Sequence, residues 1–257
     1  MNNIEIFIIS DNTHNTHNTH TTMVLNRFYH ENKSIIEIGV DEAGRGPMFG
    51  RVYSAAVILP KNNSNFKHEL MKDSKLFHSK KKIKEVAEYI KSNSIAYKIS
   101  YEEHTTIDKH NILSATHMAM HSAINHIINY SNRNLLLIDG NNFKHLTYFD
   151  TKTQSIREVP HVCIVNGDNK YTAIAAASIL AKVARDTYIE ELCKEHEYLI
   201  DRYDLLNNKG YGTKKHMEGI LKYGISPWHR RTFGICKNAP EAPDAPEAPD
   251  APDTFNL

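Results

Sequence analysis

Four carboxylates occupy positions in this 257-residue chain where they could act together: Asp41, Glu42, Asp139 and Asp168. They stand at three positions in the chain, because Asp41 and Glu42 are adjacent. Each position follows a short apolar run of the kind that forms buried strands, directly or within a few residues. Neighbouring strands in a sheet lie about 5 Å apart, so acidic residues at one edge of a sheet can converge. The spacing therefore predicts a cluster of carboxylates at a single sheet edge.

Such a cluster needs compensation, because four ionised carboxylates close together repel one another. Hard divalent cations that prefer oxygen ligands, Mg²⁺ or Mn²⁺, are suited to this, and no set of Cys and His residues accompanies the carboxylates to favour zinc. Two such ions about 3.5–4 Å apart would suit in-line phosphoryl displacement. The sequence thus predicts a two-metal hydrolytic site, although Asp-Glu before a glycine turn is also common surface chemistry.

A glycine turn follows the first two carboxylates and reads Gly44-Arg45-Gly46-Pro47. Its glycines expose backbone N–H groups that a phosphate or a sugar hydroxyl can approach closely. The turn lacks the Gly-Lys-Ser/Thr of a P-loop, and the next glycine, Gly50, does not complete a G-x-G-x-x-G motif. The sequence therefore argues against a nucleotide-binding module of either kind.

Apolar runs and helical spacing alternate along the chain, which predicts an α/β fold with a mixed sheet flanked by helices. The runs 35–40 and 52–59, on either side of the glycine turn, predict adjacent antiparallel strands. The expected strands are 35–40, 52–59, 94–101, 135–140 and 161–165, and the expected helices are 79–91, 107–130, 171–196 and a short one capped by Thr213. The alanine-rich first half of helix 171–196 predicts unusually close packing.

Composition narrows the class of protein further. The formal net charge is +1, but the last 19 residues are acidic, and the rest of the chain is about +6, which fits a polyanionic partner. Three widely spaced cysteines argue against a disulfide framework and for a reducing compartment. No apolar stretch approaches the ~20 residues of a membrane span. We expect a cytoplasmic monomer with no membrane partner.

The two ends of the chain differ in composition from its centre. Residues 1–34 include three Asn-Thr-His repeats, and residues 238–257 repeat Ala-Pro-Glu and Ala-Pro-Asp. Both segments are expected to be disordered, with a catalytic domain over 35–237 and a small C-terminal helical part. Two alternatives stay open: a metal-binding tract at His14, His17 and His20, and a true start at Met23.

Residues 41–47 (Asp-Glu-Ala-Gly-Arg-Gly-Pro) resemble the signature of type 2 ribonuclease H, ribonuclease HII. The resemblance runs from about residue 35 to 233 through Asp-Ser-Lys at 73–75, Ile-Asp-Gly at 138–140, Gly-Asp at 167–168, the segment 175–186, Gly-Tyr-Gly-Thr at 210–213 and His-Arg-Arg-Thr-Phe at 229–233. It implies a ribonuclease H-like fold and an endonuclease that cleaves the RNA strand of RNA–DNA hybrids. It also implies incision 5′ to ribonucleotides embedded in duplex DNA, leaving 3′-hydroxyl and 5′-phosphate ends.

The resemblance also assigns site residues. The Mg²⁺ or Mn²⁺ ligands and catalytic residues would be Asp41, Glu42, Asp139 and Asp168. The substrate contacts would be Gly44, Arg45 and Gly46 at the 2′-hydroxyl, Tyr211 stacked on the next deoxyribose, and Lys75, Lys182, His229 and Arg230 near phosphates. Two alternatives remain: a solvated basic turn at 229–231, and a structural pair between Arg185 and Asp186.

Two rival functions are kept. Ribonuclease HIII shares the carboxylates, but that family carries Lys where this chain has Arg45 and adds an N-terminal domain. A non-catalytic protein that binds RNA–DNA hybrids is the second rival. One departure from the family pattern is Leu76, which replaces the second lysine of an Asp-Ser-Lys-Lys sequence and leaves that lysine's contribution to phosphate binding in doubt.

Overall fold

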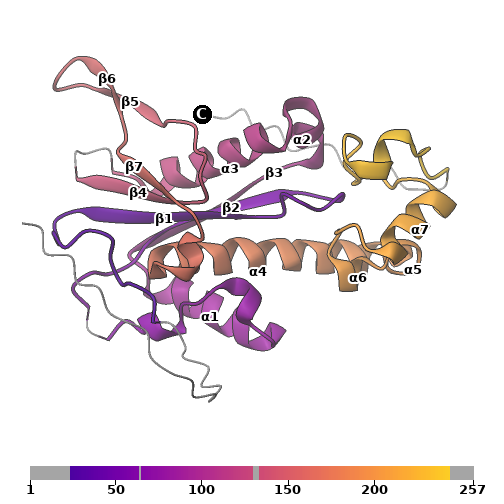
Figure 1. Cartoon of the computed structure of the whole chain (residues 1–257), viewed down its shortest axis with the longest axis horizontal. Helices are drawn as coiled ribbons and strands as arrows, with labels where there is room; N and C mark the ends of the chain where they lie inside the picture. Colours follow the sequence, from indigo (N-terminus) through magenta and orange to yellow (C-terminus); the bar gives the residue numbers. More distant parts are fainter. Residues whose placement is uncertain (1–23, 64, 130–132, 244–257) are drawn as a thin grey trace, which may run out of the picture.

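The computed structural model describes residues 24–63, 65–129 and 133–243. Over these ranges the chain forms a five-stranded mixed sheet with helices on both faces (Figure 1). The predicted α/β class with a mixed sheet is confirmed. Among the described helices, none combines the length and the apolar character needed to cross a bilayer.

The sheet has the strand order β3-β2-β1-β4-β7. Its central strand β1 runs antiparallel to β2 and parallel to β4, which confirms the predicted antiparallel pair around the glycine turn. β3 pairs antiparallel with β2, and β7 pairs parallel with β4 at the other edge. The strands are β1 (Ile36–Ala43), β2 (Val52–Ile58), β3 (Ala96–Glu102), β4 (Asn134–Asp139), β5 (Thr147–Asp150), β6 (Ser155–Glu158) and β7 (His161–Ile164).

Helices cover both faces of the sheet. In Figure 1, α1 and α4 lie on one face, and α2 and α3 lie on the other. One core cluster joins α1 and α4 to β2, and another joins α3 to β1, β2 and β4. The helices are α1 (Lys80–Asn93), α2 (His104–His110), α3 (Ile112–Ile127), α4 (Thr172–Glu195), α5 (Tyr198–Tyr203), α6 (Leu205–Asn208) and α7 (Lys214–Tyr223), with 3-10 turns η1 (His68–Leu70), η2 (Ser74–Leu76), η3 (Gly167–Asn169) and η4 (Gly234–Asn238).

The long helix predicted over 107–130 is wrong, because Asn111 divides it into α2 and α3. Asn111 has φ 66°, a left-handed value that a helix cannot continue through. Its side chain then accepts the Ser114 N–H at 3.0 Å and caps the start of α3. One residue therefore ends one helix and begins the next.

Two features were not predicted. β5 and β6 form a separate two-stranded sheet, which projects from the edge of the molecule in Figure 1. The short helices α5 and α6 follow α4 and pack with α7 into the expected C-terminal helical part. The capping role of Thr213 is confirmed, since its hydroxyl accepts the His216 N–H at 3.3 Å.

The predicted close packing of the alanine-rich helix is confirmed at Gly39 in β1. A Cβ atom at this position would lie 2.2 Å from the backbone carbon of Ala173 in α4. Only glycine allows this approach, because the obstructing atoms are backbone and cannot rotate away. The contact sets α4 directly on the central strand that carries Asp41.

The folded part of the chain extends beyond residues 35 and 237, the predicted limits. Asn26 pairs with Lys170 and Thr172 through backbone hydrogen bonds of 2.8 and 3.0 Å. At the other end, Ile225 pairs with Pro240 and Ala242. Parts of the predicted disordered segments, 24–34 and 238–243, thus belong to the folded body. The His repeats, Met23 and residues 244–257 lie outside the described residues.

Candidate active site

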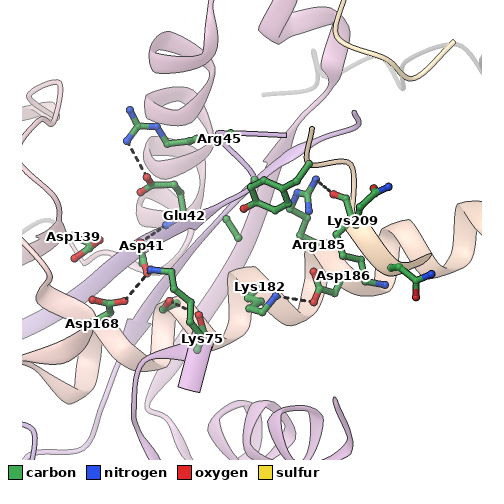
Figure 2. A pocket seen from close by; sticks show the side chains of 18 residues that line it. Asp41, Glu42, Arg45, Lys75, Asp139, Asp168, Lys182, Arg185, Asp186 and Lys209 are labelled. Carbon is green, nitrogen blue, oxygen red and sulfur yellow. Dashed lines mark hydrogen bonds and ion pairs between the residues drawn. The ribbon is translucent and has the colours of Figure 1, made fainter. Parts of the chain in front are cut away.

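Asp41 and Asp139 are placed side by side by the pairing of two parallel strands. Val40 in β1 lies opposite Ile138 in β4, so the next residue of each strand is one of the two carboxylates. Side chains alternate along a strand, and both carboxylates share the sheet face that α4 covers. Figure 2 shows them together at one end of the sheet with Glu42 and Asp168.

Asp168 comes from the turn after β7. Asn166 adopts a left-handed backbone (φ 54°, ψ 44°), and the 3-10 turn η3 follows it. The Gly167 N–H then donates to Asp139 Oδ1 at 2.6 Å. A Cβ at Gly167 would meet Ile174 Cδ1 at 2.5 Å and Asp139 Oδ1 at 3.2 Å, so glycine allows the turn to close on the neighbouring carboxylate. The hydrogen bond fixes Asp168 next to Asp139.

The site disfavours negative charge in the absence of a cation. Burial raises the pKa of Asp41 well above its ordinary value, and the charges of Glu42 and Asp139 raise it further. Burial also raises the pKa of Glu42 and of Asp168, with Asp139 adding to both effects. These shifts are the expected result of placing carboxylates close together away from water.

Two basic side chains approach the cluster from its mouth. Arg45 Nη1 lies 3.1 Å from Glu42 Oε1, and Lys75 Nζ lies 3.9 Å from Asp168 Oδ2. Their side chains are 50% and 79% exposed, so water weakens both pairs. Burial opposes the charge of Lys75, but the carboxylates of Asp73 and Asp168 raise its pKa overall. The oxygen-only donor set of the four acids fits a hard divalent cation such as Mg²⁺ or Mn²⁺.

The glycine turn meets the tyrosine loop beside this cluster. A Cβ at Gly46 would lie 3.4 Å from Tyr211 Cε1, so the turn and the ring face each other. Tyr211 is half exposed, and the Arg185 guanidinium lies 6.0 Å from its ring centre. Gly44 has φ 98°, and a Cβ there would collide with Arg185 at 2.2 Å. Gly46 therefore presents exposed backbone next to an exposed ring, whereas Gly44 is buried against Arg185.

A single cavity of about 470 Å³ contains both parts. Its lining includes every predicted site residue except His229 and Arg230: Asp41, Glu42, Gly44, Arg45, Gly46, Lys75, Asp139, Asp168, Lys182 and Tyr211. The carboxylates lie at one end in Figure 2 and Arg185 and Lys209 at the other. A strand of nucleic acid could contact both ends at once.

Comparisons with known proteins agree with this arrangement. Residues 38–236 match the family model described as Ribonuclease HII. A ribonuclease HII of Phocaeicola vulgatus is 42% identical over 82% of this chain and 94% of its own length. The chain belongs to the ribonuclease HII family. This membership favours type HII over type HIII and identifies the chain as an endoribonuclease of the ribonuclease H type, which acts on RNA–DNA hybrids.

Solved structures show the same fold. The ribonuclease H2 of Pyrococcus horikoshii covers 79% of this chain and 96% of its own, with a TM-score of 0.62 and 22% identity. A ribonuclease HIII, Bst-RNase HIII, solved in complex with Mn²⁺, covers 74% of this chain and 70% of its own, with a TM-score of 0.52 and 15% identity. The predicted ribonuclease H-like fold is confirmed.

The structure places His229 and Arg230, which were predicted to contact phosphates, behind the cavity lining, with both side chains fully buried. The Arg230 guanidinium donates to five backbone carbonyls at 2.6–3.1 Å. These acceptors surround the glycine turn and belong to Gly44, Arg45, Pro47, Gly50 and Arg51. Arg230 therefore holds the turn from behind rather than facing the substrate.

His229 belongs to a buried chain of hydrogen bonds that reaches the tyrosine loop. The Ser226 N–H donates to His229 Nδ1 at 2.9 Å, and His229 Nε2 lies 3.0 Å from His216 Nε2. His216 Nδ1 lies 2.9 Å from the Tyr211 carbonyl oxygen. This series of hydrogen bonds supports the backbone of Tyr211, and neither histidine lines the cavity.

The charged residues of α4 have other partners than the Arg185–Asp186 pair considered from the sequence. Lys182 Nζ pairs with Asp186 at 2.9 Å, whereas Arg185 donates to the Lys209 carbonyl at 2.8 Å. Asp186, for which a structural pair with Arg185 was one alternative, thus pairs with Lys182 at the cavity wall. Arg185 instead joins α4 to the tyrosine loop.

Sequence reasoning missed three supporting residues. Asp73 accepts the Lys75 N–H at 2.8 Å and an Asn169 amide N–H at 3.3 Å, linking the lysine to the Asp168 turn. Ser74 and Ser178 lie 3.1 Å apart and join the same turn to α4. The Asp-Ser-Lys motif was the available signal, but spacing alone does not show which of its members face inward.

Proposed function

We propose that this chain hydrolyses the RNA strand of RNA–DNA hybrids and incises duplex DNA 5′ to an embedded ribonucleotide, leaving 3′-hydroxyl and 5′-phosphate ends. The observation that carries the proposal is the meeting of four carboxylates with the glycine turn and Tyr211 in one cavity. The family membership supports the general reaction. The site residues and the single-ribonucleotide specificity are our own assignment.

Asp41, Glu42, Asp139 and Asp168 would hold two Mg²⁺ or Mn²⁺ ions. When bound, the ions supply charge neutralisation for the scissile phosphate and lower the pKa of a bound water. The chain's own residues complete the site. Burial, and then the neighbouring carboxylates, raise the pKa values of Asp41, Glu42 and Asp168, so a bound cation would offset both the loss of water and the mutual repulsion of their charges.

Gly44, Arg45 and Gly46 would select the nucleotide. Only the 2′-hydroxyl distinguishes a ribonucleotide from a deoxyribonucleotide at one position, and exposed backbone groups in a glycine turn can reach it. Tyr211 would stack on the following deoxyribose, and Lys75 and Lys182 would approach phosphates as point charges. Arg230 and His229 would act as positioning residues through the turn and the loop.

The test uses a labelled DNA duplex that contains one ribonucleotide. With Mg²⁺ or Mn²⁺, the wild-type protein should cut once, 5′ to the ribonucleotide, and should leave an all-DNA duplex intact. Asp139→Asn should reduce the rate at least about 100-fold, which is roughly 2.7 kcal/mol of transition-state stabilisation. The exposed Asp201→Asn serves as a matched control and should retain the wild-type rate.

Each contrary outcome points to a different alternative. Binding without cleavage under any divalent cation would favour a protein that only binds hybrids. Wild-type activity in Asp139→Asn would reject the metal-site assignment. Cleavage of long hybrids without incision at a single ribonucleotide would retain the family reaction and reject the finer specificity.

We also propose that the protein works as a cytoplasmic monomer. Its three cysteines, Cys163, Cys193 and Cys236, are free thiols, which suits a reducing compartment. Light scattering of the purified chain and fractionation of cells that express it test these two points separately.

A further inference from the structure

We propose a second cation site, for zinc or a similar borderline metal, formed by His145, Glu158 and His161. One ligand atom from each residue lies within 4.8 Å of the others. Two imidazoles and one carboxylate form a common zinc-binding set, with a fourth position left for water. The site shares no residue with the carboxylate cluster and would bind a different class of cation.

The three residues come from three segments that are already fixed to one another. His145 immediately precedes Leu146, and Glu158 immediately precedes Val159. The Val159 N–H donates to the Leu146 carbonyl at 2.8 Å, and both of these side chains are buried. His161 begins β7 in the main sheet. The ligands therefore stand on a rigid base, which reduces the entropy lost when a metal binds.

One of the ligand pairs in the cluster already has the spacing of a metal site, and a second pair is too close. Ligand distances of 2.0–2.2 Å place neighbouring donor atoms about 3.3 Å apart. His161 Nδ1 lies 3.3 Å from Glu158 Oε1, and His145 Nδ1 lies 2.5 Å from the same oxygen. The imidazole rings are 5.1 Å apart between centres, and Phe143 packs against His161 at 5.3 Å. A small outward movement of His145 would make room for an ion.

One nitrogen in the cluster lacks a hydrogen bond. His161 Nδ1 is buried and has no hydrogen-bond partner among the described residues, although it points toward Glu158. Its carboxylate neighbour Glu158 Oε1 lies 3.3 Å away but not in hydrogen-bond geometry, so the packing of the three side chains leaves this buried nitrogen without a hydrogen bond, which costs free energy. A bound cation would satisfy it. This observation favours a metal site over a simple cluster of two histidines and a glutamate.

The bound ion would join the β5–β6 hairpin to the sheet. The hairpin has four residue pairs of its own and projects from the body in Figure 1. A metal at its base would link the segment before β5, the end of β6 and the start of β7. Its expected effect is therefore on stability rather than on the reaction.

Calorimetric titration of the full-length protein with Zn²⁺ tests the site. Excess Mg²⁺ keeps the carboxylate cluster occupied, and a His14→Ala/His17→Ala/His20→Ala background removes the histidine repeat as a competing ligand. In that background we expect one zinc equivalent, which His145→Ala/His161→Ala should abolish. Glu158→Gln should weaken binding at least about tenfold, because even outer-shell partners of a metal contribute 10–100-fold. His126→Ala, another exposed histidine, is the matched control.

Thermal unfolding gives an independent readout. Zn²⁺ should raise Tm in the background protein and in the His126 variant, but not in the His145/His161 variant, since a ligand that binds only the folded state stabilises it. Circular dichroism checks that the variants are folded, and Glu158→Gln provides a second, milder change. Unchanged zinc stoichiometry and affinity in both site variants, or no zinc binding in excess Mg²⁺, would overturn the proposal.

Discussion

The carboxyl group of Asp41 lies in a place where a negative charge is unfavourable. Its pKa is raised above the ordinary value of 3.8, first by burial and then by Glu42 and Asp139. A group whose pKa is raised by folding contributes stability below its unfolded pKa, and that contribution is lost as the pH rises through the folded pKa. Without metal, the wild-type protein should therefore be less stable at pH 8 than the uncharged variant.

Asp41→Asn should accordingly raise Tm in EDTA at pH 8, with the difference shrinking as the pH falls toward 4. The same variant should lose activity by at least about 100-fold if it removes a metal ligand. Melting curves in EDTA between pH 4 and 8 measure the first effect, and the incision assay with Mn²⁺ measures the second, with Asp201→Asn as control in both. A lower Tm for Asp41→Asn in EDTA at pH 8 would contradict the electrostatic argument.

The buried guanidinium of Arg230 should stabilise the glycine turn through its five hydrogen bonds. Lysine has three N–H donors, so Arg230→Lys would leave at least two of the five carbonyls around the glycine turn without that partner. Each unsatisfied buried acceptor costs about 1–3 kcal/mol, so we expect a loss of about 3 kcal/mol in the free energy of unfolding. Urea denaturation measures it.

The neighbouring Arg231 provides the control for this substitution. Its side chain is 57% exposed and pairs with Glu241 at the surface. Surface pairs contribute about 0–1 kcal/mol, so Arg231→Lys should change stability little. Equal effects of the two substitutions would show that the buried bonds of Arg230 do not hold the turn.

At the scale of elements, α7 and the segment before η4 are joined by the pair His216–His229. Because His229 Nδ1 accepts the Ser226 N–H, its Nε2 must carry the proton and donate to His216 Nε2. His216 then donates from Nδ1 to the Tyr211 carbonyl. Each ring is thus neutral in one defined tautomer, and an added proton breaks the contact between the rings.

Acid should therefore weaken this connection. Burial lowers the pKa of both histidines, and for His229 the charges of His216 and His104 lower it further. A base whose pKa is lowered by folding contributes stability above its unfolded pKa of about 6.5, and this is lost as the pH falls. His216→Gln should make the decline in unfolding free energy from pH 7 to 5 shallower, by up to about 1.4 kcal/mol per pH unit.

Chemical denaturation across this pH range provides the measurement. The slope, rather than the absolute stability, is compared, because the substitution also removes a buried hydrogen bond. His126→Ala, which changes an exposed histidine, should keep the wild-type slope. An unchanged slope in His216→Gln would show that the pKa of this histidine does not differ between the folded and unfolded states.

At the scale of the whole molecule, the acidic end of the chain opposes binding to polyanions. Residues 244–257 carry four carboxylates and no Lys or Arg, so a chain ending at Pro243 has a formal net charge of +5 instead of +1. It should bind RNA–DNA hybrids more tightly at low salt and lose the difference at high salt. Cleavage should be retained.

A chain ending at Asn238 gives the comparison. It also lacks Ala242, which is buried, and the backbone pairing of Ile225 with Pro240 and Ala242. This shorter chain should therefore have a lower Tm than the one ending at Pro243. Fluorescence anisotropy over a salt series and melting curves measure the two effects, and equal Tm values would place residues 239–242 outside the folded body.

The sequence was informative where local pattern determines structure. Apolar runs predicted the five strands of the sheet, and their ends predicted where Asp41, Asp139 and Asp168 would meet. It was uninformative where distant residues determine the environment. Arg230 lies in a basic turn that resembles surface, yet its acceptors are 179–186 residues away in the chain. The left-handed backbone of Asn111 likewise could not be predicted, because the helical spacing of apolar residues continues on both sides of it.

The hairpin of β1 and β2 carries both Glu42 and Gly44. Two peptide units separate them, so their Cα atoms are no more than about 7 Å apart in any conformation. If one reads the sugar and the other helps to cut, the recognised nucleotide and the cleaved bond must both lie within reach of this short span of backbone. Covalent structure then limits how far the cut can lie from the recognised nucleotide.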